Sequence, residues 1–529
     1  MDDEIENKKR IVGFFYEKGI LLNPDIFEAI KDIDLNKFHE NLKNKEFFEE
    51  ILILNRDITK ILDKNKNIEL DWKEFEKAAT KFEKNENAKI YGQFLEFLSK
   101  EKKEEEIMPP NNGVKVIFSY IDDLKQREAQ DFTSFFNARH RALEKILRNR
   151  QEIINLTSIS KIIIKKDRSE VSLIGIVKEI AQTKNKNLVM VVEDPTGEIK
   201  ILVNKNKPEL YAEALNIVPD EVIGIVGVNG DNIVFADNIL WPEVPLTREL
   251  KKSPDEAYAI FLSDLHVGSK QFLPEEFNKF IKWINGGLGD DAQQEIARKI
   301  KYIFIAGDLV DGVGVYPEQD SELEIKDIYD QYNKCAELLQ QIPKNIQLII
   351  CPGNHDAMRI AEPQPQLYKD FAGAIWQLPN VTMVSNPAVV RIHETKDFSG
   401  FDVLLYHGYS FDYYVAHVDS IRRNGGYDRA DLIMSFLLKR RHLAPTHTST
   451  LYMPDANKDS LVIDIIPDFF VTGHIHKTCV AAYKNITMIC GSCWQSTTTF
   501  QEKVGHHPEP ARVPIVNLQT RKIKILRFG

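Results

Sequence analysis

The stretch AIFLSDLHVG, residues 259–268, places an acidic residue and a histidine directly after an apolar run. Ile260 and Leu262 belong to a run that is typical of a buried β-strand. Asp264 and His266 are costly to bury unless they are paired or bound to a cation. The stretch therefore predicts a buried strand that ends in a polar site.

Four later apolar runs end in the same way. The runs are followed by Asp308 and Asp311 in AGDLVDG, by Asn354, His355 and Asp356 in PGNHD, by His407 in YHG, and by His474 and His476 in GHIH. Segments with helical periodicity lie between them, so strands alternate with helices over residues 255–529. Layered α/β is the class that this alternation predicts.

These polar residues are expected to meet, because the carboxyl ends of the strands in such a fold converge on one edge. Side chains two apart in an extended segment point the same way, which would bring Asp264 beside His266 and His474 beside His476. Carboxylate, imidazole and amide ligands without thiolate favour manganese, with iron, zinc or magnesium as alternatives. The set is too large for one ion, so we expect two divalent cations, with Asp308 between them, in a site suited to phosphodiester hydrolysis.

Three motif residues or pairs are given supporting roles. Asp311 is expected to orient ligands or to cap a turn, and Asp356 is expected to cap a helix and not to bind metal. The CGSC stretch contains Cys490 and Cys493, but a single CxxC is a poor zinc site, so core cysteines are expected.

Composition limits the class of protein. The chain has 529 residues, 43% of them hydrophobic and 28% charged, which fits several globular domains. No apolar run reaches about 18 residues, so no membrane span is expected. The amino terminus lacks the apolar segment of a secretory signal, and five cysteines form no disulfide framework. These features predict a reducing, cytoplasmic compartment.

Four regions follow from the patterning along the chain. We expect a helical N-terminal domain at 1–80, a charged linker with a basic amphipathic helix at 81–160, a β-barrel at 165–245 and the layered α/β domain at 255–529. Five short strand-like runs favour an oligonucleotide/oligosaccharide-binding (OB) fold for the barrel. Its few aromatics favour protein docking over DNA stacking, although both remain open.

Basic residues offer candidate contacts to DNA phosphates. Arg422 and Arg423 form one run, and Arg440 and Arg441 belong to another. The basic side of helix 131–150, which includes Arg139, is a further candidate. A solvated surface explains each of them equally well, and the net charge of -10 argues against a protein that coats nucleic acid.

The five motifs SDLH, GDLVD, GNHD, YHG and GHIH resemble those of the calcineurin-like metallophosphoesterase superfamily. The resemblance implies a two-sheet sandwich flanked by helices. It also implies one cation held by Asp264, His266, Asp308 and His476, and another held by Asp308, Asn354, His407 and His474. His355 would be a catalytic residue that stabilises the transition state without binding metal.

Longer stretches, among them VVEDPTGEIKILV and ICGSCWQSTTTFQ, are similar to the small subunit of the archaeal family D DNA polymerase. That resemblance covers roughly residues 115–529. It implies 3′→5′ exonuclease proofreading on single-stranded or mismatched 3′ ends and a large catalytic polymerase subunit as partner. The alternatives are an independent nuclease or phosphatase of the same superfamily, or a scaffold subunit without catalysis.

Overall fold

The chain forms two compact units, residues 1–106 and 107–529. The computed structural model describes residues 11, 14–15, 21–22, 53–54, 113–122, 126–504 and 507–529. In the first unit, β1 (Leu21–Leu22) pairs in parallel with β2 (Ile53–Leu54). The helices predicted within 1–80 and the charged stretch 101–106 otherwise lie outside the described residues.

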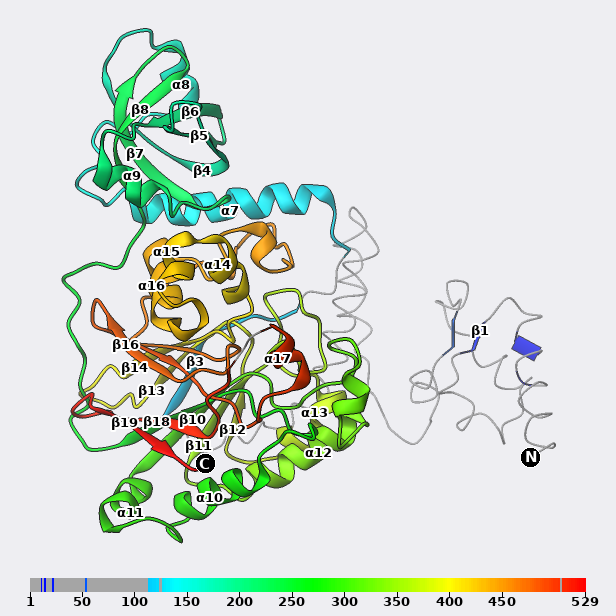
Figure 1. The fold of residues 1–529 in the computed structure, drawn as a ribbon. Helices are drawn as coiled ribbons and strands as arrows, with labels where there is room; N and C mark the ends of the chain where they lie inside the picture. Colours follow the sequence, from blue (N-terminus) through cyan, green and yellow to red (C-terminus); the bar gives the residue numbers. More distant parts are fainter. Residues whose placement is uncertain are drawn as a thin grey trace, which may run out of the picture. The chain divides into compact units, whose positions relative to one another are not determined.

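The second unit contains the small closed barrel that the sequence predicts (Figure 1). Its strands are β4 (Glu170–Gln182), β5 (Leu188–Asp194), β6 (Gly197–Val203), β7 (Val222–Asn229) and β8 (Ile233–Leu240). They close in the order β4-β5-β6-β8-β7, with β6 and β8 parallel and the other pairs antiparallel. Alternate residues such as Met190, Val192 and Ile201 fill the interior, beneath the short helices α8 (Ile159–Ile164) and α9 (Pro208–Ala214).

Two six-stranded sheets form the rest of this unit. The first has the order β12-β11-β10-β9-β18-β19, with β9 (Tyr258–Leu262), β10 (Ile300–Ala306), β11 (Gln347–Cys351), β12 (Val381–Met383), β18 (Arg512–Asn517) and β19 (Ile523–Arg527). The strands from β9 to β12 are parallel and almost wholly apolar, as expected for a sheet covered on both faces.

The second sheet has the order β16-β17-β15-β14-β13-β3. Its strands are β3 (Val114–Ser119), β13 (Ala388–Ile392), β14 (Phe401–Leu405), β15 (Phe469–Thr472), β16 (Cys479–Tyr483) and β17 (Ile486–Cys490). Strand β3 lies within 81–160, for which the sequence predicts a linker and a helix, so the prediction of a linker is wrong for this segment. The alternating VKVIFS pairs with β13 instead and extends the sheet.

The sheets pack face to face, with helices on their outer faces (Figure 1). Phe261 and Phe304 of the first sheet and Phe469 of the second meet in the core between them. The first sheet is covered by α10 (Pro274–Ile284), α11 (Asp291–Arg298), α12 (Ile328–Leu339) and α13 (Lys369–Trp376). The second is covered by α14 (Phe411–His417), α15 (Asp419–Arg423) and α16 (Ala430–Arg440).

Helix α7 (Ala129–Leu147) lies between the barrel and the second helical layer (Figure 1). Arg139, expected on its basic face, is instead buried, and its Nε donates to Asp459 Oδ2 at 2.7 Å. The same carboxylate oxygen lies 2.8 Å from His442 Nε2. This buried cluster joins α7 to the segment that follows α16, so Arg139 is not available to nucleic acid.

Candidate metal centre

Five strand ends supply the polar residues singled out in the sequence. Asp264 and His266 follow β9, Asp308 follows β10, and the PGNHD loop follows β11. His407 follows β14, and the GHIH loop follows β15. The strands within each sheet run parallel here, so their carboxyl ends lie on one side.

Left-handed backbone conformations mark these loops. The φ angles are 51° at Asp264, 49° at His266, 53° at Asp308, 71° at His474 and 54° at His476. Such angles are uncommon for residues other than glycine, and strain of this kind gathers at functional sites. The expectation of extended DxH and HxH segments is therefore wrong, although the side chains within each pair do converge. The loops turn back after the strands and are held by contacts such as the Asp264 N–H donating to the Gly307 carbonyl at 3.0 Å.

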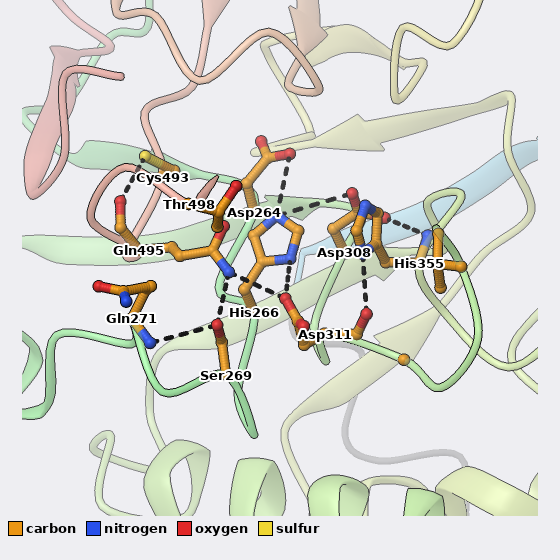
Figure 2. A network of polar contacts seen from close by, with 12 residues as sticks. Asp264, His266, Ser269, Gln271, Asp308, Asp311, His355, Cys493, Gln495 and Thr498 are labelled. Atoms are coloured by element: carbon orange, nitrogen blue, oxygen red, sulfur yellow. Dashed lines mark hydrogen bonds and ion pairs between the residues drawn. The ribbon is translucent and has the colours of Figure 1, made fainter. Parts of the chain in front are cut away.

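The first donor set comprises Asp264, His266, Asp308 and His476. The Nε2 atoms of His266 and His476 lie 3.0 Å apart, and His476 Nε2 is 3.4 Å from Asp264 Oδ1. His266 Nε2 lies 4.0 Å from Asp264 Oδ1 and 3.8 Å from Asp308 Oδ2. Figure 2 shows His266 between Asp264, Asp308 and Asp311. All four residues of the set are buried.

The second donor set comprises Asp308, Asn354, His407 and His474. Asp308 Oδ2, which also faces the first set, lies 3.3 Å from His407 Nε2. Asn354 Oδ1 lies 2.9 Å from His407 Nε2 and 3.0 Å from His474 Nδ1. The two sets therefore share the Asp308 carboxylate.

The spacing of these donors fits a pair of divalent cations. Nitrogen and oxygen ligands at about 2.0–2.2 Å from an ion are separated from one another by about 3.0–3.5 Å. Most of the donor separations fall in or near that range. One three-residue cluster with spacings suited to a cation lies within the first set and comprises Asp264, His266 and His476. Another joins the two sets and comprises Asp264, Asp308 and His407. The donors contain no thiolate, which suits manganese, iron, zinc or magnesium.

The charges also favour a cation at this place. Burial alone would raise the pKa of Asp308, but His407 and His355 hold it well below its ordinary value. Burial would lower the pKa of His407, but the neighbouring carboxylates, Asp308 above all, raise it to about 10. The negative charge of two buried carboxylates, Asp308 and Asp264, thus favours the protonated form of His407. A bound cation would neutralise the same negative charge.

His355 lies beside both donor sets. Its backbone N–H donates to Asp308 Oδ1 at 2.8 Å, and its ring Nδ1 lies 2.8 Å from the Asp311 carbonyl oxygen. The carbonyl can only accept, so Nδ1 carries the proton of the neutral ring. Burial lowers the pKa of His355, which favours that neutral form.

Two glycines allow the loops to approach the carboxylates. A Cβ built on Gly353 would lie 2.1 Å from Asp308 Oδ1, and one on Gly473 would lie 2.5 Å from Asp264 Oδ2. Any larger residue at these positions would displace a carboxylate oxygen. The glycines of the PGNHD and GHIH stretches are therefore needed for this arrangement.

Asp311 and Asp356 support the site from behind. Asp311 Oδ1 lies 3.2 Å from His266 Nδ1 and accepts a hydrogen bond from Gln495 Nε2 at 2.9 Å. The prediction that Asp356 caps a helix is wrong, because no helix begins beside it. Its Oδ2 accepts from the Gly353 N–H at 2.8 Å and thereby fixes the PGNHD turn. Cys490 and Cys493 are buried and free, as predicted.

Other supporting residues carry no sequence motif. Asn386 Oδ1 accepts from the His407 N–H at 2.9 Å, and its amide nitrogen lies 3.4 Å from buried Glu362. Asp412 Oδ2 lies 3.0 Å from His474 Nε2. These contacts join residues more than twenty positions apart, and no local pattern in the sequence announces them.

The candidate DNA-contacting arginines separate into two groups. Arg440 and Arg441 are each 3% exposed, so their assignment to DNA is wrong. Arg440 pairs with buried Glu221 of the barrel, while Arg441 donates to the carbonyl groups of Ile463 and Asp464. A basic run that could have been solvated is thus a buried link between barrel and sandwich.

Arg422 and Arg423 retain exposed side chains, 54% and 74% respectively, and both pair with Asp419. Their contact with DNA stays a prediction. None of the helices in the described part of the chain has the length and hydropathy of a membrane span.

The fold is mixed α/β with a small closed barrel, and the site is a candidate centre for two cations. Residues 259–480 match the model of the family of DNA polymerase alpha/epsilon B subunits. The DNA polymerase II small subunit of Methanothermobacter thermautotrophicus is 37% identical over 78% of this chain and 83% of its own length. That of Archaeoglobus fulgidus is 38% identical over 81% and 84%.

The chain therefore belongs to the family of archaeal DNA polymerase II small subunits, which confirms the predicted relationship to the small subunit of the archaeal family D enzyme. The small subunit of Pyrococcus furiosus is 40% identical over 75% of this chain. The match spans 64% of that relative, so this chain covers less than two thirds of its length.

Proposed function

We propose that this chain is the small subunit of a replicative DNA polymerase and removes nucleotides from the 3′ end of DNA with a pair of divalent cations. The observation that carries the proposal is the sharing of Asp308 between two donor sets built from five strand ends. Family membership supports the polymerase context. Single-stranded or mismatched 3′ ends are the proposed substrates, and a large catalytic polymerase subunit is the proposed partner.

The residues of the two sets would hold the cations, most suitably Mn²⁺. When bound, such ions supply Lewis acidity and lower the pKa of an attacking water. Asp308 contributes negative charge to both sets, and Asp311 orients His266.

His355 would act on the substrate directly. Its Nδ1–H is held by the Asp311 carbonyl, so Nε2 is the ring atom left to meet the phosphoryl group or the leaving 3′ oxygen. Because burial lowers the pKa of His355 and favours the neutral ring, Nε2 would first have to take up a proton, which it could then donate to that oxygen as the bond to phosphorus breaks. This role needs no bond from His355 to metal, in contrast to the neighbouring Asn354.

The domain plan supports the same proposal. The barrel order and the parallel β6–β8 pair suit an OB fold, and the two packed sheets suit a calcineurin-like phosphoesterase. Phe235 is 46% exposed on the barrel, whereas Trp241 is buried against Lys439 of α16. With so few exposed aromatics, we propose that the barrel docks protein and does not stack DNA bases.

A manganese-supplemented nuclease assay on the full chain tests the activity. Oligonucleotides labelled at the 3′ or 5′ end, single-stranded or mismatched, would be incubated with wild type, His355→Ala and the matched control His417→Ala, whose histidine is exposed on α14. We expect stepwise shortening from the 3′ end by wild type and His417→Ala, and none by His355→Ala with metal binding intact.

Two results would contradict the proposed nuclease function, and each would favour a different alternative. Faster hydrolysis of small aryl phosphates than of DNA would favour an independent phosphatase. No manganese-dependent cleavage by wild type, alone or with its large subunit, would favour a scaffold subunit.

A further inference from the structure

The outer nitrogen of His474 is held by a residue that no motif contains. Nδ1 of this histidine faces Asn354 Oδ1 at 3.0 Å, inside the second donor set. Nε2, on the opposite side of the ring, lies 3.0 Å from Asp412 Oδ2. Asp412 Oδ1 in turn accepts a hydrogen bond from the Tyr427 hydroxyl at 2.9 Å.

Three separate elements build this arrangement. Asp412 stands in the first turn of α14, whose neighbour Phe411 is buried and anchors the helix to the sheet. Tyr427 belongs to the short helix η4 (Gly426–Asp428), which packs against α14. His474 stands in the loop after β15, with its backbone in the left-handed region. The carboxylate therefore meets the ring from an element independent of the GHIH loop.

The contact decides which ring nitrogen can bind metal. A carboxylate accepts, so the Nε2 of His474 carries the proton when it faces Asp412, and Nδ1 keeps a lone pair directed at the donor set. A histidine that ligates a metal commonly donates its other N–H to a carboxylate, which fixes the tautomer and the ring orientation. In the first donor set, Asp311 Oδ1 likewise lies on the outer side of a histidine ring, 3.2 Å from Nδ1 of His266.

We propose that Asp412 is a positioning residue for the second cation: it holds His474 with Nδ1 free to ligate, and Tyr427 holds Asp412. The inference rests on the proposed function, because it assumes that the second donor set binds a cation. The side chain of Asp412 is 49% exposed, whereas Asp311 is fully buried. Water therefore weakens the Asp412 contact. Removal of a carboxylate that holds a metal-binding histidine typically lowers metal affinity about 10- to 100-fold, and for Asp412 we expect the lower end of that range.

A titration of the metal-free full chain with Mn²⁺, followed by electron paramagnetic resonance of the free ion, tests the inference. For Asp412→Ala we expect one of two binding steps to weaken by about tenfold, with the other unchanged. Asp412→Asn should lose less, since its amide oxygen can still accept from Nε2. Asp330→Ala removes an exposed aspartate from the first turn of α12 and should bind both ions as wild type does.

Thermal unfolding in EDTA separates positioning from a structural role. Asp412→Ala and Asp330→Ala should then melt within a degree or two of wild type, since no metal is present. If Asp412→Ala binds both ions with wild-type affinity, the inference is overturned while the proposed function stands. A large loss of metal-free stability, with both binding steps weakened equally, would also overturn it. Failure of wild type to bind two ions would instead overturn the proposed function.

Discussion

Protonation of His442 should destabilise the folded protein in mildly acidic solution. The ring is buried, with Nε2 2.8 Å from Asp459 Oδ2, while Nδ1 accepts a hydrogen bond from the Ala444 N–H at 3.0 Å. A second ring proton would have to sit on Nδ1, against that N–H. Burial, and then the charge of nearby Arg139, lower the pKa of His442 from 6.5 to about 4.

The sign and size of the effect follow from this lowered pKa. Between pH 6.5 and 4 the unfolded chain takes up a proton on His442 and the folded chain does not, so the free energy of unfolding falls as the pH falls. The difference of about 2.5 units corresponds to about 3 kcal/mol over the whole window. Asp459 changes the free energy of unfolding little between pH 6.5 and 4. Burial would raise the pKa of this carboxyl, but Arg139 and His442 hold it well below its ordinary value.

Urea unfolding in EDTA, followed by tryptophan fluorescence and circular dichroism from pH 7.5 to 4.5, measures the effect. Other groups titrate in both states, so the quantity of interest is the stability of wild type minus that of His442→Gln, which cannot titrate. That difference should shrink by about 2.5 kcal/mol at the acidic end. A difference for His442→Gln that does not change with pH would refute the reasoning.

Three further predictions test the site and the domain contact. Asp308→Ala should abolish the binding of both cations, which equilibrium dialysis with Mn²⁺ would show; retention of two tightly bound ions would exclude the shared carboxylate. Gly353→Ala should weaken Mn²⁺ binding at least tenfold, because its Cβ would lie 2.1 Å from Asp308 Oδ1, and an unchanged affinity would mean that the loop relaxes freely. Arg440→Met should lower the free energy of unfolding by about 3 kcal/mol by leaving Glu221 buried alone, and Glu221→Leu in the same chain should recover much of it.

The strands and the polar residues at their ends could be predicted from the sequence, because both have local signatures. Apolar runs such as YAIFL and YIFIA have few alternatives to a buried strand. The residues that follow them, such as Asp264 and His407, are costly to bury, so their position after such runs predicts a shared site. Strand β3 has a similar signature in VKVIFS, but the charged residues before it favoured a linker.

Features set by distant contacts could not be predicted in this way. The left-handed conformation of Asp264 depends on two backbone hydrogen bonds to residues far along the chain. The Asp264 N–H donates to the Gly307 carbonyl, and the Asp264 carbonyl accepts from the Trp494 N–H. The burial of Arg440 depends on Glu221 in another part of the fold. The sequence of a basic run is the same whether its side chains face water or a buried partner, and so is that of an aspartate such as Asp412.

Mn²⁺ soaked into crystals of the full chain, with diffraction recorded on either side of the manganese absorption edge, tests the two-cation centre most directly. Two anomalous peaks should flank the Asp308 carboxylate, about 3.5 to 4 Å apart, one beside His266 and His476 and the other beside Asn354 and His407. A single peak, or none at these side chains, would contradict the two-cation centre and the hydrolysis proposed for it.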